Sequence, residues 1–96
     1  MSLRPKLAEI IHEKSYDEKA DLLEGNPPRL TDVMAAIEWS LARDPKQGTE
    51  LEPGYRVYKT TSIYKTPAFW VLYKYEEASH KVFLMSLEAV KKVAEL

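Results

Sequence analysis

Basic and aromatic residues alternate through the second half of the chain, and this mixture is the part of the sequence best suited to chemistry with an anionic partner. Eight of the ten aromatic residues fall between positions 55 and 83. Cationic groups bind phosphates and flat rings stack on unpaired bases, so the mixture suits a single-stranded nucleic acid or an acidic surface. The candidate contact residues in this stretch are Arg56, Tyr58, Lys59, Lys65, Trp70 and Lys74.

The same composition has a structural explanation. Strands are enriched in aromatic residues because these pack well on a pleated surface, and lysines on edge strands deter aggregation. Composition alone leaves both interpretations open.

Other kinds of site are excluded or unsupported. The chain has no cysteine, which rules out disulfides, thiolate zinc sites and cysteine nucleophiles. The histidines, His12 and His80, are 68 positions apart and neither has a carboxylate at a ligand spacing, so we expect no metal ion. Three glycines cannot form a P-loop or a dinucleotide fingerprint, so no cofactor is expected. No serine stands in a G-x-S-x-G motif.

The charges divide unevenly along a chain whose formal net charge is −1. Residues 1–53 carry seven basic and eleven acidic groups, a net of −4, whereas residues 54–96 carry seven basic and four acidic groups, a net of +3. The basic half is therefore the predicted binding surface. The longest apolar run, Ala68–Tyr73, is far shorter than the roughly 20 residues of a membrane helix. With no cysteine and no signal-like segment, we expect a cytoplasmic protein without membrane association.

We expect residues 1–96 to form one domain, which opens with a strand over residues 7–14. Leu7, Ile10 and Ile11 would also fit a helix, but Ser15 and Glu18 have the spacing of a capping box, which favours a strand before a helix start at Ser15. A helical hairpin is predicted over residues 15–44. A break falls at Gly25 and the following prolines, and the second helix has apolar residues at three- and four-residue steps: Leu30, Val33, Met34, Ile37 and Leu41.

Antiparallel strands are predicted over residues 54–87, after the turn at Pro53-Gly54. The strongest, Phe69–Tyr75, begins apolar on both sides, which indicates a central place in the sheet. A C-terminal helix is predicted over residues 88–96. The order β-α-α-β-β-β(-α) gives an α+β fold, with an N-terminal helical hairpin packed on a small antiparallel sheet.

This element order, together with several short motifs, resembles the RelE/ParE superfamily of toxins from type II toxin–antitoxin systems. The chain looks like a divergent member of that superfamily. The motifs are Leu41-Ala42-Arg43-Asp44-Pro45, a connector containing Gly48, Gly54-Tyr55-Arg56-Val57-Tyr58-Lys59, Phe69-Trp70-Val71-Leu72-Tyr73 and a last strand Val82–Ser86. The resemblance implies a small bacterial toxin held inactive by a cognate antitoxin. RelE-like members cut mRNA in the ribosomal A site, and ParE-like members act on DNA gyrase.

The resemblance also implies catalytic residues for the cleaving branch. Attack by a ribose hydroxyl on a phosphate requires a base, an acid and cations. Arg56 falls where the family often has a basic residue, and Lys59 is close to it. Two departures bear on activity, because Trp70 replaces the arginine expected on the middle strand and Leu84–Val90 contains no Arg, His or Tyr.

Three functions therefore stay open. The first is a ribosome-dependent mRNA endonuclease with an incomplete catalytic set. The second is a non-catalytic protein-binding module of the same fold, and the third is a gyrase-directed toxin.

Overall fold

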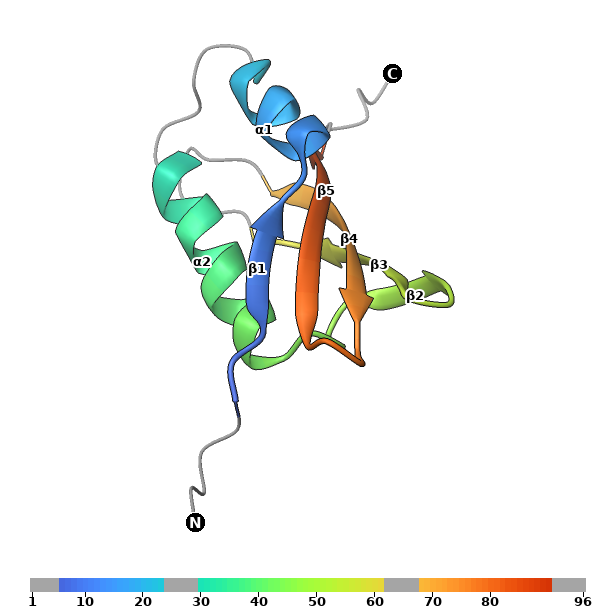
Figure 1. The fold of residues 1–96 in the computed structure, drawn as a ribbon. Coiled ribbons are helices and arrows are strands. Elements are labelled where there is room, and N and C mark those ends of the chain that lie inside the picture. The colour runs from blue at the N-terminus through green and yellow to red at the C-terminus, as the bar shows by residue number, and fades with distance from the viewer. Residues whose placement is uncertain (1–5, 24–29, 62–67, 91–96) are drawn as a thin grey trace.

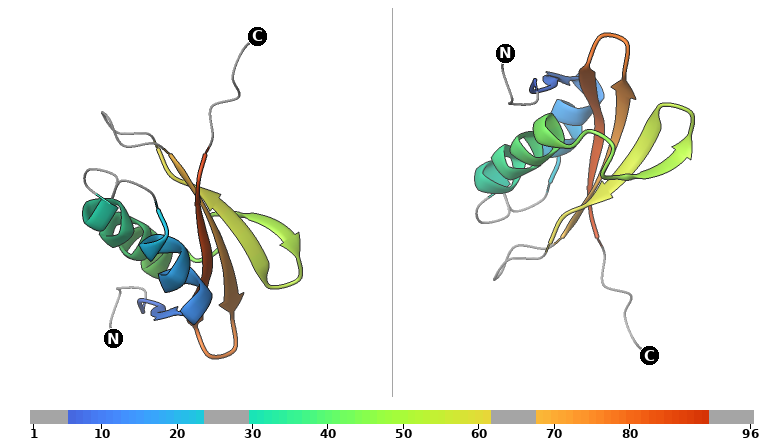
Figure 2. Two further views of the ribbon diagram at one scale, coloured as in Figure 1. Left: turned by 90° about the horizontal axis from the view of Figure 1, so that it is seen from above. Right: turned by 90° about the horizontal axis from the view of Figure 1, so that it is seen from below.

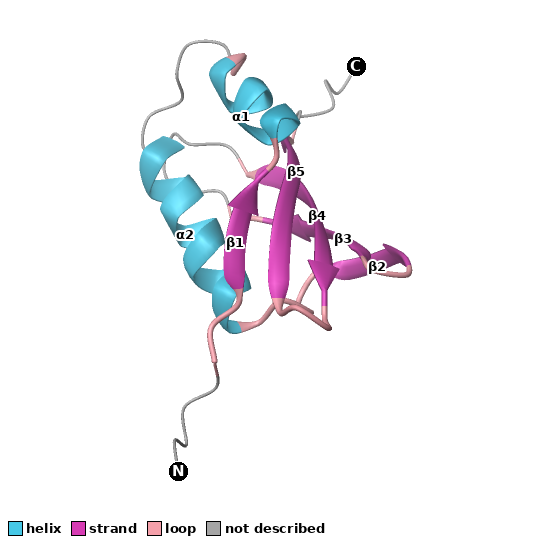
Figure 3. Ribbon diagram, in the orientation of Figure 1, coloured by secondary structure: helices cyan, strands magenta, loops and turns pink. Residues whose placement is uncertain are grey.

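Two helices lie on one face of a five-stranded sheet, which confirms the predicted α+β class (Figure 1). The computed structural model describes residues 6–23, 30–61 and 68–90. The two layers separate clearly by secondary structure (Figure 3). In chain order the elements are β1 (Glu9–His12), α1 (Lys14–Asp21), α2 (Leu30–Arg43), β2 (Thr49–Glu52), β3 (Tyr55–Lys59), β4 (Phe69–Glu76) and β5 (Lys81–Ala89).

The strand order in the sheet is β1-β5-β4-β3-β2, which places β4 in the middle as its apolar sequence predicts. β1 runs parallel to β5, and every other pair is antiparallel. The sheet is therefore mixed, which corrects the expectation of a purely antiparallel one. A parallel pair requires a long crossover connection, and the chain between β1 and β5 includes both helices and provides it.

The first strand is confirmed, although it is shorter than the predicted residues 7–14. The helix after it does not begin with the predicted capping box. The Glu13 N–H donates to the Leu84 carbonyl at 2.9 Å, which holds the chain against β5, and α1 begins immediately afterwards at Lys14. The Ser15 hydroxyl donates instead to the Met85 carbonyl at 2.5 Å. Met85 is the extra residue of a bulge in β5 and has no partner in β4, so Ser15 binds a carbonyl at an irregular point of the ladder.

Two predictions for the second half were wrong. β2 lies in the segment that was expected to be a connector. The sequence did not indicate a strand there, because the exposed residues of β2 include Glu50 and Glu52, which have low strand propensity. Glu88 and Ala89 were expected to begin a helix, but they continue β5 because they pair with Trp70 and Phe69 of β4. Residues 91–96, the rest of that predicted helix, lie outside the described residues.

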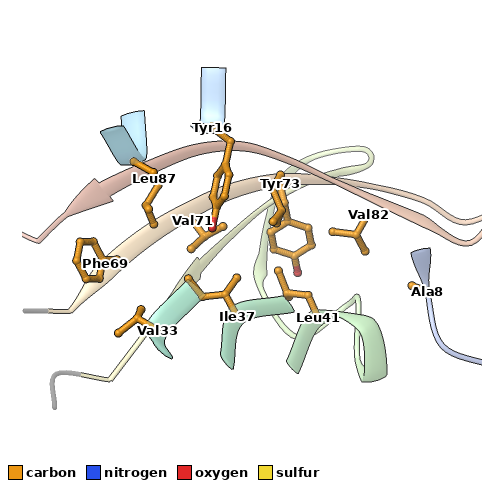
Figure 4. Close-up of a cluster of buried hydrophobic side chains, with 12 residues drawn as sticks. Ala8, Tyr16, Val33, Ile37, Leu41, Phe69, Val71, Tyr73, Val82 and Leu87 are labelled. Carbon is orange, nitrogen blue, oxygen red and sulfur yellow. The ribbon is translucent and has the colours of Figure 1, made fainter. Parts of the chain in front are cut away.

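The core lies between α2 and the inner face of the sheet (Figure 4). Val33, Ile37 and Leu41 recur every four residues and form one buried stripe of α2. Each such side chain contributes about 1.5–3 kcal/mol when it is fully buried. The sheet contributes Phe69, Val71 and Tyr73 from β4 and Val82, Leu84 and Leu87 from β5. Seen along the sheet, both helices lie on one side of the strands, and no described helix covers the other (Figure 2).

Candidate binding face

The face of the sheet turned away from the helices gathers part of the predicted site. Alternate residues of β4 point to opposite faces, so burial of Phe69, Val71 and Tyr73 directs Trp70, Leu72 and Lys74 outward. The β3 residues opposite these three in the register are Lys59, Val57 and Tyr55, which share the same side. We call this surface the open face; its residues are Tyr55, Val57, Lys59, Trp70, Leu72, Lys74, Phe83, Ser86 and Glu88.

Two lysine–aromatic pairs mark the two ends of the open face. The Lys59 ammonium lies 5.4 Å from the centroid of the Trp70 ring, and the Lys74 ammonium lies 5.7 Å from that of Tyr55. Each pair joins neighbouring strands across one register position. Lys59 and Tyr55 are four residues apart in β3, so the two pairs are separated by about 13 Å at a rise of about 3.3 Å per residue.

The centre of the open face is apolar and slightly hollowed. Val57 and Leu72 lie opposite one another between the two lysine–aromatic pairs. A shallow hollow of about 200 Å³ is lined by Val57, Trp70, Leu72, Ser86 and Glu88. Trp70 is 41% exposed. The surface thus offers a cation, an apolar centre and a second cation in line.

Arg56, the leading catalytic candidate, lies on the other side of the sheet. Its register partner is the buried Tyr73, so its side chain points towards the helix side. One guanidinium nitrogen donates to the Lys46 carbonyl at 2.9 Å and to the Gly48 carbonyl at 2.7 Å. The side chain is only 17% exposed and lies 3.8 Å from Glu50. Arg56 therefore holds the connector between α2 and β2, and the structure does not bring it together with Lys59.

Tyr73, in the central strand β4, binds the same connector through its side chain. Its hydroxyl donates to the Pro45 carbonyl at 2.7 Å and accepts the Gly48 N–H at 3.0 Å. Burial raises the pKa of the Tyr73 hydroxyl, while the hydrogen bond from Gly48 and the charge of Arg56 oppose this shift. Gly48 allows the close approach, because a Cβ there would lie 2.7 Å from both the Tyr73 hydroxyl and the Val57 carbonyl.

The remaining predicted residues are dispersed. Tyr58 pairs with the buried Val71 and packs against the core, so it does not belong to the open face. Lys65 lies outside the described residues. Tyr55 and the apolar centre were missed as binding residues, although the alternation of β3 separates Tyr55 and Lys59 from Arg56 and Tyr58. No helix among the described residues is long and apolar enough to span a membrane, and no described group of three His, Asp or Glu side chains is arranged to hold a metal ion.

The chain has an α+β fold of the RelE-like kind, which is defined by its helical hairpin, its strand order and its open face. The chain is similar to a chain in the crystal structure of the toxin–antitoxin complex RelBE2 from Mycobacterium tuberculosis. The two share 15% sequence identity with a TM-score of 0.70, over 88% of this chain and 99% of that one. No protein-family model and no curated protein sequence matches. The resemblance to RelE-like toxins is thus confirmed at the level of the fold.

Proposed function

We propose that this chain is a toxin-like protein of a toxin–antitoxin pair and that its open face binds an acidic segment of the antitoxin. One observation carries the proposal: two lysine–aromatic pairs flank an apolar centre on the face that no described helix covers. The fold supports it as well, because the similar crystal structure is that of a toxin–antitoxin complex.

The chemistry of the open face favours carboxylates around an apolar side chain. Carboxylates pair with Lys59 and Lys74, and an apolar side chain fits the hollow beside Trp70. Lys81 also points to this side of the sheet, but its register neighbours are Glu9 and Glu76, which offset its charge. Each lysine–aromatic pair also has an acidic register neighbour, Glu88 opposite Trp70 and Glu52 opposite Tyr55, and the Glu88 carboxylate is paired with Lys19 at 3.4 Å. Lys59 and Lys74 are the cations that flank the apolar centre.

The geometry supports binding rather than RNA cleavage. Cleavage requires a base, an acid and cations that converge on one phosphate. Lys59 and Lys74 stand at register positions about 13 Å apart along the strands, and each ammonium lies over the aromatic ring of its own pair rather than beside the other ammonium. Arg56, the other catalytic candidate, uses its guanidinium to bind backbone carbonyls on the opposite side.

The direct test is binding to the product of the neighbouring gene, measured by calorimetry with the full chain. Neutralising both open-face cations in a Lys59→Gln/Lys74→Gln variant is expected to weaken binding about tenfold and to reduce its salt dependence. A matched control, Lys6→Gln/Lys14→Gln, removes the same charge from positions outside the open face. Equal affinity in the two double variants would place the partner elsewhere.

Expression of the protein alone separates the finer activities. Binding without cleavage predicts growth arrest with no new mRNA 5′ ends, and inhibition of purified gyrase would then identify the gyrase-directed branch. New 5′ ends would contradict the non-cleaving mechanism and support a ribosome-dependent endonuclease. Partner binding without growth arrest would support the protein-binding module instead.

A further inference from the structure

A histidine lies between two carboxylates where β1, α1 and α2 meet, on the helix side of the sheet and away from the open face. His12 Nδ1 lies 2.9 Å from Asp17 of α1, and Nε2 lies 3.2 Å from Glu38 of α2. The ring also meets Tyr16 edge to face, with centroids 5.1 Å apart. Both ring nitrogens therefore contact groups that accept a hydrogen bond but cannot donate one when they are ionised.

This arrangement determines what the imidazole can do. A neutral imidazole has one N–H and one lone pair. The lone pair of its unprotonated nitrogen would therefore face a lone pair of a carboxylate oxygen, which is repulsive. With a proton on both nitrogens, each carboxylate accepts a charge-assisted hydrogen bond. The charged ring then has no free lone pair with which to act as a general base or to bind a metal ion.

We propose that His12 is a proton-operated clasp that holds α1 and α2 together against β1, so that the seating of the helical layer on the sheet depends on pH. Asp17 and Glu38 come from different helices, and His12 joins them from the strand. Loss of a proton leaves the ring with one N–H, so one of the two carboxylates loses its hydrogen bond.

The groups packed around the ring agree with this direction. Asp17 and Tyr16 face it from α1 and Glu38 faces it from α2, while its register partner in β5 is the apolar Leu84. Burial is the largest single influence and lowers the pKa of His12, but the hydrogen bonds and charges of Asp17 and Glu38 together outweigh it. The pKa is therefore raised above its ordinary value of 6.5.

The sign of the pH dependence follows by linkage. A raised pKa in the folded state means that the clasp stabilises the protein fully below pH 6.5, where the unfolded chain also binds the proton, as long as the two carboxylates remain ionised. The stabilisation is lost as the pH rises through the folded-state pKa. The unfolding constant increases about tenfold for each unit by which the folded pKa exceeds the unfolded one.

The first measurement is an NMR titration of His12 in the full chain. We expect His12 to titrate above 6.5, and amide exchange in α2, corrected for the intrinsic effect of pH, to accelerate over the same range. Asp17→Asn and Glu38→Gln should each lower the pKa of His12. A folded-state pKa at or below 6.5 would overturn the proposal without any need for a variant.

The second measurement compares urea unfolding of the wild-type chain with two histidine variants between pH 5.5 and 8.5. His12→Gln should abolish the loss of stability with rising pH. His80→Asn is the matched control, because His80 has φ 56° and asparagine tolerates that conformation. This control should keep the wild-type slope, and a slope that survives in His12→Gln would contradict the clasp.

Discussion

The hydroxyl of Tyr73 and the backbone of Gly48 are bound directly to one another, with the Gly48 N–H donating at 3.0 Å. The same hydroxyl donates to Pro45, so one side chain from the central strand satisfies two backbone groups of the connector. Arg56 binds two further carbonyls of that connector. Residues whose types suggest catalysis here fix the path of the chain between α2 and β2.

Removing the Tyr73 hydroxyl is expected to destabilise the protein. Tyr73→Phe leaves the Gly48 N–H and the Pro45 carbonyl without this partner in a largely buried place. Leaving buried donors and acceptors without partners lowers the free energy of unfolding by about 1–3 kcal/mol. Urea denaturation monitored by circular dichroism measures it, and an unchanged midpoint would show that the two bonds contribute nothing.

The same substitution at Tyr16 is expected to have the opposite sign. Tyr16 is fully buried, and none of the described residues bonds to its hydroxyl. Tyr16→Phe removes a desolvated polar group that has no compensating bond, which should raise the free energy of unfolding by about 1 kcal/mol. Tyr73→Phe is the matched control, since it deletes the same atom from a site where that atom is bonded. Destabilisation by both changes would reveal a partner for the Tyr16 hydroxyl.

Adding one methyl group at Gly48 should be costly. The new Cβ would overlap the Tyr73 hydroxyl and the Val57 carbonyl, and the second of these is backbone that cannot swing away. Gly48→Ala is expected to lose about 1–3 kcal/mol of stability. Combining it with Tyr73→Phe removes the overlap with the hydroxyl but keeps those with the Val57 carbonyl and with the Tyr73 ring carbon Cε1, which lies 2.9 Å from the new Cβ. The double variant should therefore lose less than the two single losses added together. Strict additivity would mean that the two residues are not coupled.

Arg56→Met distinguishes a structural arginine from a catalytic one. The change keeps most of the length of the side chain but removes the donors to Lys46 and Gly48, so we expect a loss of about 1–2 kcal/mol in unfolding free energy. Thermal and urea denaturation test this. If expression of the wild-type chain arrests growth, a variant with wild-type stability that no longer does so would instead support a direct role of Arg56 in catalysis.

Trp70→Ala tests the open face through its aromatic anchor. Trp70 is partly exposed and lines the hollow, so its removal should weaken binding of the proposed antitoxin partner by about tenfold or more with little change in stability. Trp39→Ala is the control, because Trp39 is 60% exposed on α2, outside the open face. Equal affinities of the two variants would remove Trp70 from the binding site.

Much of the fold was predictable because its elements follow periodic patterns. The spacing of Val33, Ile37 and Leu41 specified the buried side of α2, and the apolar run from Phe69 specified the central strand. The bulge at Met85 was not predictable. It shifts the alternation so that Leu87, and not Ser86, points into the core after Leu84, and such a shift depends on how β4 and β5 pair.

The site was predictable in its residue types but not in its grouping. Lys59 and Arg56 are three positions apart, which places them on opposite faces of a strand, and this followed from the alternation of β3. The binding of Arg56 to the connector did not follow from the sequence, because the carbonyls that Arg56 binds belong to a segment without a regular pattern. The role of His12 was also beyond the sequence, since Asp17 and Glu38 meet only after both helices have packed.

The parallel pairing of β1 with β5 has a consequence for biosynthesis. Glu9 aligns with Lys81, 72 positions later, so β1 has no strand to join until most of the chain has left the ribosome. The hairpins of β2, β3 and β4 are local by comparison and can form earlier. A nascent chain is therefore expected to pair β2, β3 and β4 before β1 takes its place beside β5. The part of the open face that carries both lysine–aromatic pairs belongs to β3 and β4, so it is expected to form before the sheet is complete.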